Sequence, residues 1–181
     1  MRDPRRSSDP TAEPSGDFEA LAGALDRLLA DFDRAYDRRP LAATLLLTDF
    51  FLPYLREMYR IFDGDIALAI VLAEIGHAST RRFTDPRRHD ALDLVDANSE
   101  TLMAAVRPCN ALSASLASGV PRETARRKVL ELAARGWIAE HEGGWVTTPA
   151  AGERFVPHFN REQARRLLQS ARRLIDVLDR D

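Results

Sequence analysis

The most informative part of the sequence is residues 110–138, which read NALSASLASGVPRETARRKVLELAARGWI. Small residues predominate before Gly119, which predicts a short helix, about Ala111–Ala117, that a second helix can cross closely. Gly119 can adopt the left-handed backbone conformation that reverses the chain, and Pro121 suits a helix start, where its missing amide hydrogen does no harm. The pattern therefore predicts two helices joined by a tight turn, the second over residues 121–135.

This second helix has an apolar side and a basic side. Successive helical residues turn by about 100°, so Ala125, Val129 and Leu132 share one side. Between Pro121 and Lys128 there are four cations and one anion, in a chain whose formal net charge is -2. A local concentration of positive charge is what contact with nucleic acid requires. The candidate DNA-binding residues are Pro121, Arg122, Glu123, Thr124, Arg126, Arg127 and Lys128.

The chemistry of these side chains suits duplex DNA. The arginines can bond bidentately to guanine edges, and Glu123 can accept from the cytosine amino group. Thr124 or Lys128 can hold phosphates. Arg122 lies at the N-terminal end, the end that helix-turn-helix proteins insert toward base edges. A solvated amphipathic helix is the plainer interpretation of an isolated basic helix, but the sequence that follows favours DNA contact.

A β-hairpin is predicted directly after the basic helix. Gly136 ends the helix, and Trp137–Glu140 and Trp145–Thr148 form two short strands around a turn at residues 141–144. The tip of this hairpin is acidic, which makes it a poor partner for phosphates. We expect Trp137 and Trp145 to pack the hairpin against the helices rather than to stack on bases.

Residues 98–149 resemble the winged helix-turn-helix of bacterial transcription regulators such as the IclR, MarR and GntR families. The resemblance rests on GVPRETARRKV at residues 119–129, followed by Leu132 and RGWI at residues 135–138, and it covers under a third of the chain. It implies a sequence-specific transcriptional regulator that binds double-stranded DNA, with helix 121–135 in the major groove. The alternative is a winged-helix module that uses the same helix for protein–protein contact without binding DNA.

The predicted fold is mainly α with a small β-hairpin. Its parts are a disordered tail (1–16), a helical region (17–97), the winged helix-turn-helix (98–149) and a C-terminal helix (150–181). Apolar spacing predicts further helices over about 17–38, 41–62 (bent or divided at Pro53), 66–79 (buried on every side), 86–95, 98–107 and 161–178. Another helix or turn is expected from Thr148, broken near Pro157.

Two interpretations of residues 17–97 remain open: a self-contained helical subdomain or a dimerisation surface. The second is favoured, because symmetric half-sites on DNA are commonly read by protein two-folds, and it predicts a homodimer. Asp49 and Glu74 lie within apolar helices, where a ligand cavity is one interpretation. The favoured interpretation is that each lies at a helix edge or pairs with an arginine such as Arg56 or Arg60. The arginines of the last helix, including Arg165, Arg166, Arg172 and Arg173, are interpreted as a solvated face rather than as a second DNA contact.

The rest of the composition argues against other classes of function. The single Cys109 cannot form an internal disulfide, no secretory signal is visible, and no apolar run approaches the roughly 20 residues of a membrane span, so we expect a cytoplasmic protein. The four histidines are scattered, and the His89 and Asp93 pair is interpreted as exposed rather than metal-binding. No catalytic motif is found, so we expect no enzyme activity, no cofactor and no metal, and nothing in the sequence supports a small-molecule effector.

Overall fold

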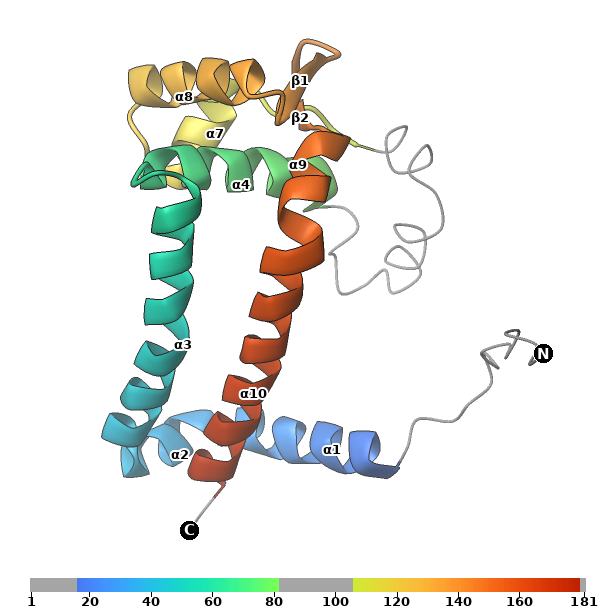
Figure 1. Cartoon of the computed structure of the whole chain (residues 1–181). Coiled ribbons are helices and arrows are strands. Elements are labelled where there is room, and N and C mark those ends of the chain that lie inside the picture. Colours follow the sequence, from blue (N-terminus) through green and yellow to red (C-terminus); the bar gives the residue numbers. More distant parts are fainter. Residues whose placement is uncertain (1–15, 82–105, 180–181) are drawn as a thin grey trace, which may run out of the picture. The chain divides into compact units, whose positions relative to one another are not determined.

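The computed structural model describes residues 16–81 and 106–179, and these residues form helices and one β-hairpin (Figure 1). The prediction of a mainly α fold with a small hairpin is therefore confirmed. The elements are α1 (Gly16–Ala30), α2 (Phe32–Arg38), α3 (Pro40–Ile61), α4 (Ile66–Thr80), α7 (Ala111–Ser118), α8 (Arg122–Ala134), β1 (Ile138–His141), β2 (Gly144–Thr147), α9 (Pro149–Phe155), a π-helical turn (Val156–Asn160) and α10 (Arg161–Leu178). No helix of the described part has the length and apolar character needed to cross a membrane.

Some helix ends differ from those predicted. The helix expected over 17–38 is interrupted at Asp31, which separates α1 from α2. Pro53 does not divide α3, which is one helix of 22 residues. Near Pro157 the chain does not leave the helical conformation but widens into a π-helical turn that leads into α10. A proline removes one backbone donor, and a π-helical turn is one way in which a helix absorbs such a gap.

Several predictions concern segments outside the described residues. These are the disordered tail up to residue 15, the helix over 86–95, and the pair of His89 and Asp93. Of the helix expected over 98–107, only residues 106 and 107 are described, and they are not helical.

The described residues between Leu52 and Arg165 form one compact unit, in which α4 packs against α7, α8 and β2. Its core contains Leu68, Val71 and Ile75 from α4, together with Val129 and Leu132 from α8. The division of the chain predicted at residue 98 placed α4 in a separate region, whereas the structure places it beneath α7 and α8. The interpretation of α4 as buried on every side is wrong, because Ile70 and Ala73 are exposed: the helices of this unit cover only one side of α4.

The hairpin is antiparallel and pairs Ile138 with Thr147 and His141 with Gly144. Its turn residues Glu142 and Gly143 both have positive φ angles, 46° and 79°, as a two-residue hairpin turn with right-handed strand twist requires. Cys109, just before α7, extends this pairing through two backbone hydrogen bonds with Trp145, of 2.9 and 2.8 Å. The hairpin is therefore tied to the chain at the start of α7.

The described residues from Gly16 to Phe51 and from Arg166 to Asp179 form the second compact unit. Its buried core consists of Leu28, Ala35, Ala43 and Leu178. Asp49 in α3 and Arg173 in α10 form an ion pair of 2.9 Å, and both side chains are more than half exposed. Asp49 thus pairs with an arginine, although not with one of those considered from the sequence.

Candidate nucleic-acid interface

The turn between α7 and α8 is held by short polar side chains. The Asn110 side chain caps α7 by accepting from the Ser113 amide at 2.8 Å. Gly119 has a φ angle of 72°, which confirms the predicted left-handed residue at this corner. The Ser115 hydroxyl donates to the Val120 carbonyl at 2.7 Å, and the Ser118 hydroxyl accepts from the Val120 amide at 3.1 Å. The sequence pattern indicated small residues here, and these hydroxyl groups also hold the turn from which α8 begins.

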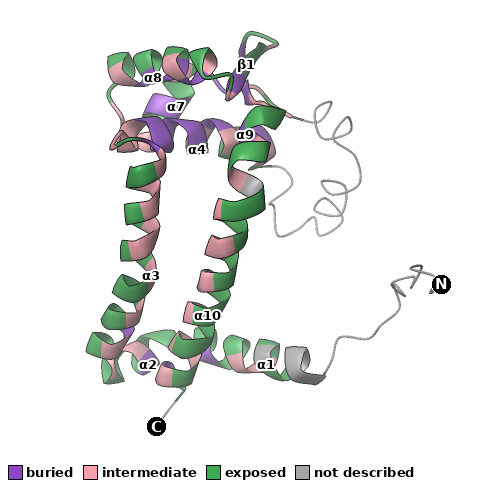
Figure 2. Cartoon of the chain, viewed as in Figure 1, coloured by how far each residue is buried: buried purple, intermediate pink, exposed green. Residues whose placement is uncertain are grey.

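The helix α8 begins at Arg122, with Pro121 exposed at its N-cap position, and its two sides differ as the helical spacing predicts. Ala125, Val129 and Leu132 are buried against the rest of the unit. Figure 2 shows exposed residues along the other side of the helix. That exposed side is named the outward face, and it consists of Arg122, Glu123, Arg126, Arg127 and Leu130, with Thr124 half-buried beside it.

The outward face is net positive. Its one internal ion pair joins Arg126 Nε to Glu123 Oε2 at 3.2 Å, and both side chains are more than 60 % exposed. An exposed pair of this kind contributes about 0–1 kcal/mol, so it does little to hold either side chain away from a ligand. Among the residues that the structure describes, Arg122 and Arg127 form no ion pair. The outward face therefore exposes three guanidinium groups and one carboxylate.

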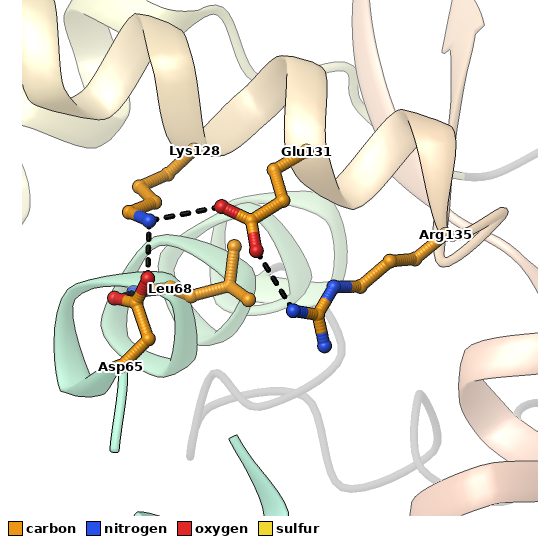
Figure 3. Close-up of polar contacts among 5 residues, drawn as sticks. All are labelled: Asp65, Leu68, Lys128, Glu131 and Arg135. Carbon is orange, nitrogen blue, oxygen red and sulfur yellow. Dashed lines mark hydrogen bonds and ion pairs between the residues drawn. The ribbon is translucent and has the colours of Figure 1, made fainter. Parts of the chain in front are cut away.

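The interpretation of Lys128 as a phosphate-holding residue needs correction. Lys128 is 9 % exposed, and its ammonium donates hydrogen bonds to Asp65 Oδ2 and, at 2.9 Å, to Glu131 Oε2. Glu131 also accepts from Arg135 at 2.8 Å, so the four side chains form one chain of charges (Figure 3). The Lys128 ammonium is paired within the fold because Lys128 lies on the same side of α8 as the buried Ala125 and Leu132.

The surroundings of this charge chain shift the pKa values of its members. Burial alone would raise the pKa of Asp65, but hydrogen bonds from the Lys128 ammonium and the Leu68 amide outweigh burial and lower it, with help from the nearby Arg127. The hydrogen bond with Asp65, followed by that with Glu131, raises the pKa of Lys128. The hydrogen bond from Lys128 is also the main cause that lowers the pKa of Glu131, and Arg135 adds to it. All three groups are thus held in their charged forms.

These shifts predict a pH-dependent contribution to stability. A carboxyl whose pKa is lower in the folded than in the unfolded chain stabilises the fold above its unfolded value, about 3.9 for Asp and 4.3 for Glu, and this stabilisation is lost as the pH falls through the folded value. We expect Asp65→Asn to lower the free energy of unfolding at about pH 7, and we expect this loss to shrink below about pH 4. Urea unfolding across this pH range measures the difference.

Asp63→Asn is the matched control, because it removes the same charge from an exposed residue of the same turn. Asparagine tolerates the positive φ angle of 51° found at residue 63. A loss for Asp65→Asn that is equally large at low and neutral pH would contradict the role assigned to the charged Asp65.

The hairpin contributes packing rather than positive charge. Trp137 contacts the rings of Phe62 and Phe155, with ring-centroid distances of 5.7 and 5.3 Å, and Trp145 packs against the same core. The prediction that both tryptophans belong to the core is confirmed. Glu140 and Glu142 are exposed near the hairpin tip, so the tip is acidic, as the sequence indicated.

Within 16–81 and 106–179, no cluster of three or more His, Cys, Asp or Glu side chains could hold a metal ion. Burial raises the pKa of the Cys109 thiol, which disfavours the reactive thiolate form.

Similarity to characterised proteins gives no guide to function. The sequence matches no family model and no curated protein, and the fold matches no solved structure.

Proposed function

We propose that this chain is a sequence-specific regulator of transcription that binds double-stranded DNA through a winged helix-turn-helix. In this proposal α7 and α8 are the helix-turn-helix, the β1–β2 hairpin is the wing, and α8 enters the major groove. The single observation that carries it is the outward face of α8, where three exposed arginines stand opposite a buried apolar side. Guanidinium groups on a helix end suit both phosphates and guanine edges.

A second candidate function is a protein–protein contact made by the same region. It is favoured by exposed leucines: Leu116 of α7 is 76 % exposed and Leu130 of α8 is 53 % exposed. Exposed apolar groups suit the core of a protein interface better than they suit phosphates. Under this alternative, Arg122, Arg126 and Arg127 would form the polar rim of the contact.

The dependence of binding on salt separates these two functions. We would first select duplexes from fragmented genomic DNA by mobility shift, and then measure affinity between about 50 and about 200 mM salt. Each phosphate contact adds about 0.9 to the slope of log affinity against log salt, so DNA binding predicts a steep slope with sequence preference retained. Failure to retain any duplex at the lower salt concentration would favour the protein-contact alternative.

Arg126→Ala tests direct reading of a base. We expect the substitution to weaken binding by roughly 1–3 kcal/mol and to relax discrimination at one base pair, because a bidentate contact to one base is lost. The measurement is a mobility shift against the selected duplex and its single-base variants. Arg154→Ala, an exposed arginine of α9, is the matched control. Unchanged binding by Arg126→Ala would remove this residue from the interface.

We further propose that the protein acts as a homodimer, paired through residues of the unit that contains α1, α2, the first part of α3 and most of α10. Among its described residues, this unit has a buried core of four residues, and many large apolar side chains are exposed. They are Leu25, Leu29, Phe32, Leu41, Leu45, Leu47, Phe51, Leu167 and Leu168. A monomer rarely leaves so many large apolar side chains in water, and a symmetric partner would cover them while matching two DNA half-sites.

Leu168→Glu tests the dimer. Leu168 is 72 % exposed, so a glutamate there should leave the fold of the monomer intact while placing an unpaired charge in the proposed contact. We expect the wild type to sediment as a dimer and Leu168→Glu as a monomer. Gln169→Glu adds the same charge at the next exposed position and should remain dimeric. A wild-type protein that stays monomeric at high concentration would rule out the homodimer.

A further inference from the structure

The only lysine of the chain lies on the inward side of the proposed DNA-reading helix. Lys128 is three residues after Ala125 and four before Leu132, so it shares their side of α8, and all three are buried. The next residue toward the N-terminus, Arg127, is exposed. Two adjacent cations therefore point in different directions, and only one of them is on the outward face.

The Lys128 ammonium donates hydrogen bonds to two carboxylates. One is Asp65, at the N-cap position of α4, and the other is Glu131, one turn further along α8 (Figure 3). An ammonium group that is paired with two acids has its charge offset and its donors engaged, so it attracts phosphate weakly. A compact ammonium on a flexible stem can reach both acids from beneath the helix, where its apolar stem packs against the core.

Asp65 also links α8 to the start of α4. Its Oδ1 accepts from the Leu68 amide at 2.9 Å, which caps α4, and its Oδ2 accepts from Lys128. The same carboxylate therefore holds the first turn of one helix and a side chain from the middle of the other. This bond joins residues 63 positions apart and adds a polar link to the apolar packing between α8 and α4.

We propose that Lys128 is a positioning residue, which orients the outward face of α8 toward DNA through its bond to Asp65 and makes no phosphate contact itself. This inference rests on the proposed DNA-binding function. Together with the packing of Ala125, Val129 and Leu132, this bond sets how α8 is oriented on the unit. Loss of the bond shifts α8 slightly, which takes the guanidinium groups of the outward face out of line with base edges while their long side chains still reach the phosphates.

The test compares three variants of the full chain, using the duplex with the highest affinity selected from genomic fragments. Lys128→Met removes the inward charge but keeps an unbranched stem of similar size. Asp65→Asn removes the partner charge, while asparagine remains a good N-cap for α4. Arg127→Met removes the adjacent outward charge and is the matched control. Each variant is measured at a temperature where urea unfolding shows it to be folded.

We expect Lys128→Met and Asp65→Asn each to weaken binding by about tenfold and to leave the salt slope unchanged, because no phosphate contact is lost. The double variant should bind no more weakly than Lys128→Met alone, since both substitutions break the same bond. Arg127→Met should lower the slope by about 0.9.

A slope that falls by about 0.9 in Lys128→Met, as in Arg127→Met, would show a phosphate contact and overturn the inference. Full affinity in Asp65→Asn would overturn it as well. In both cases the wild type still binds DNA, so the proposed function survives. If the wild-type protein binds no duplex at low salt, the proposed function fails, and this inference fails with it.

Discussion

Phe62→Ala is expected to lower the free energy of unfolding by about 3–5 kcal/mol, the usual cost of removing a buried phenylalanine. Phe62 is 2 % exposed, and its ring lies edge-on to Trp137 and stacked on Phe155, at centroid distances of 5.7 and 5.6 Å. The substitution leaves a cavity where the end of α3, the hairpin and α9 meet. Urea unfolding followed by tryptophan fluorescence measures the loss and reports directly on Trp137.

Leu116→Ala provides the comparison for Phe62→Ala. Leu116 is also a large apolar residue of the unit 52–165, but it is 76 % exposed, so its truncation should change stability by no more than about 0.5 kcal/mol. Similar losses for the two variants would contradict the placement of Phe62 in the core.

Simultaneous replacement of Arg122, Arg126 and Arg127 by alanine is expected to weaken binding to duplex DNA by about 100-fold or more, and to reduce the salt slope by between about 2 and about 3. The three side chains are exposed and the first turns of α8 are held by buried neighbours, so stability should change little. Affinity measured across a salt series gives both quantities.

The control for this triple variant removes three exposed arginines elsewhere, at Arg154, Arg161 and Arg165. It changes the net charge equally and should retain most of the affinity and the slope of the wild type. Equal weakening by both triple variants would mean that net charge, and not the outward face of α8, governs binding.

The elements that the sequence predicted well are those specified by local chemistry. Gly119 and Pro121 form the turn between α7 and α8, and Gly136 follows the end of α8. The ends of α7, α8 and the hairpin strands therefore lie within about two residues of the predicted bounds. The two-sided character of α8 also follows from helical spacing alone. In these places neighbours along the chain decide the conformation.

The features that the sequence did not predict depend on contacts between distant residues. The packing of α4 against α7 and α8 brings together segments that lie far apart in the chain. The apolar pattern of α4 predicts that the helix is buried, but it does not predict which helices cover it. The bond between Asp65 and Lys128, which joins the start of α4 to the middle of α8, was not predicted either. One signal was present: Lys128 falls on the apolar side of α8 by the same spacing that placed Ala125 and Leu132 there.

The central claim is that the outward face of α8 touches duplex DNA, and a cross-linking scan tests it most directly. A photoreactive residue would replace Glu123, Arg126 or Arg127 one at a time, with Glu153 of α9 as the exposed control. Irradiation with the selected duplex should attach DNA at the α8 positions and not at residue 153. DNA attached at residue 153 while the α8 positions attach none would contradict the claim.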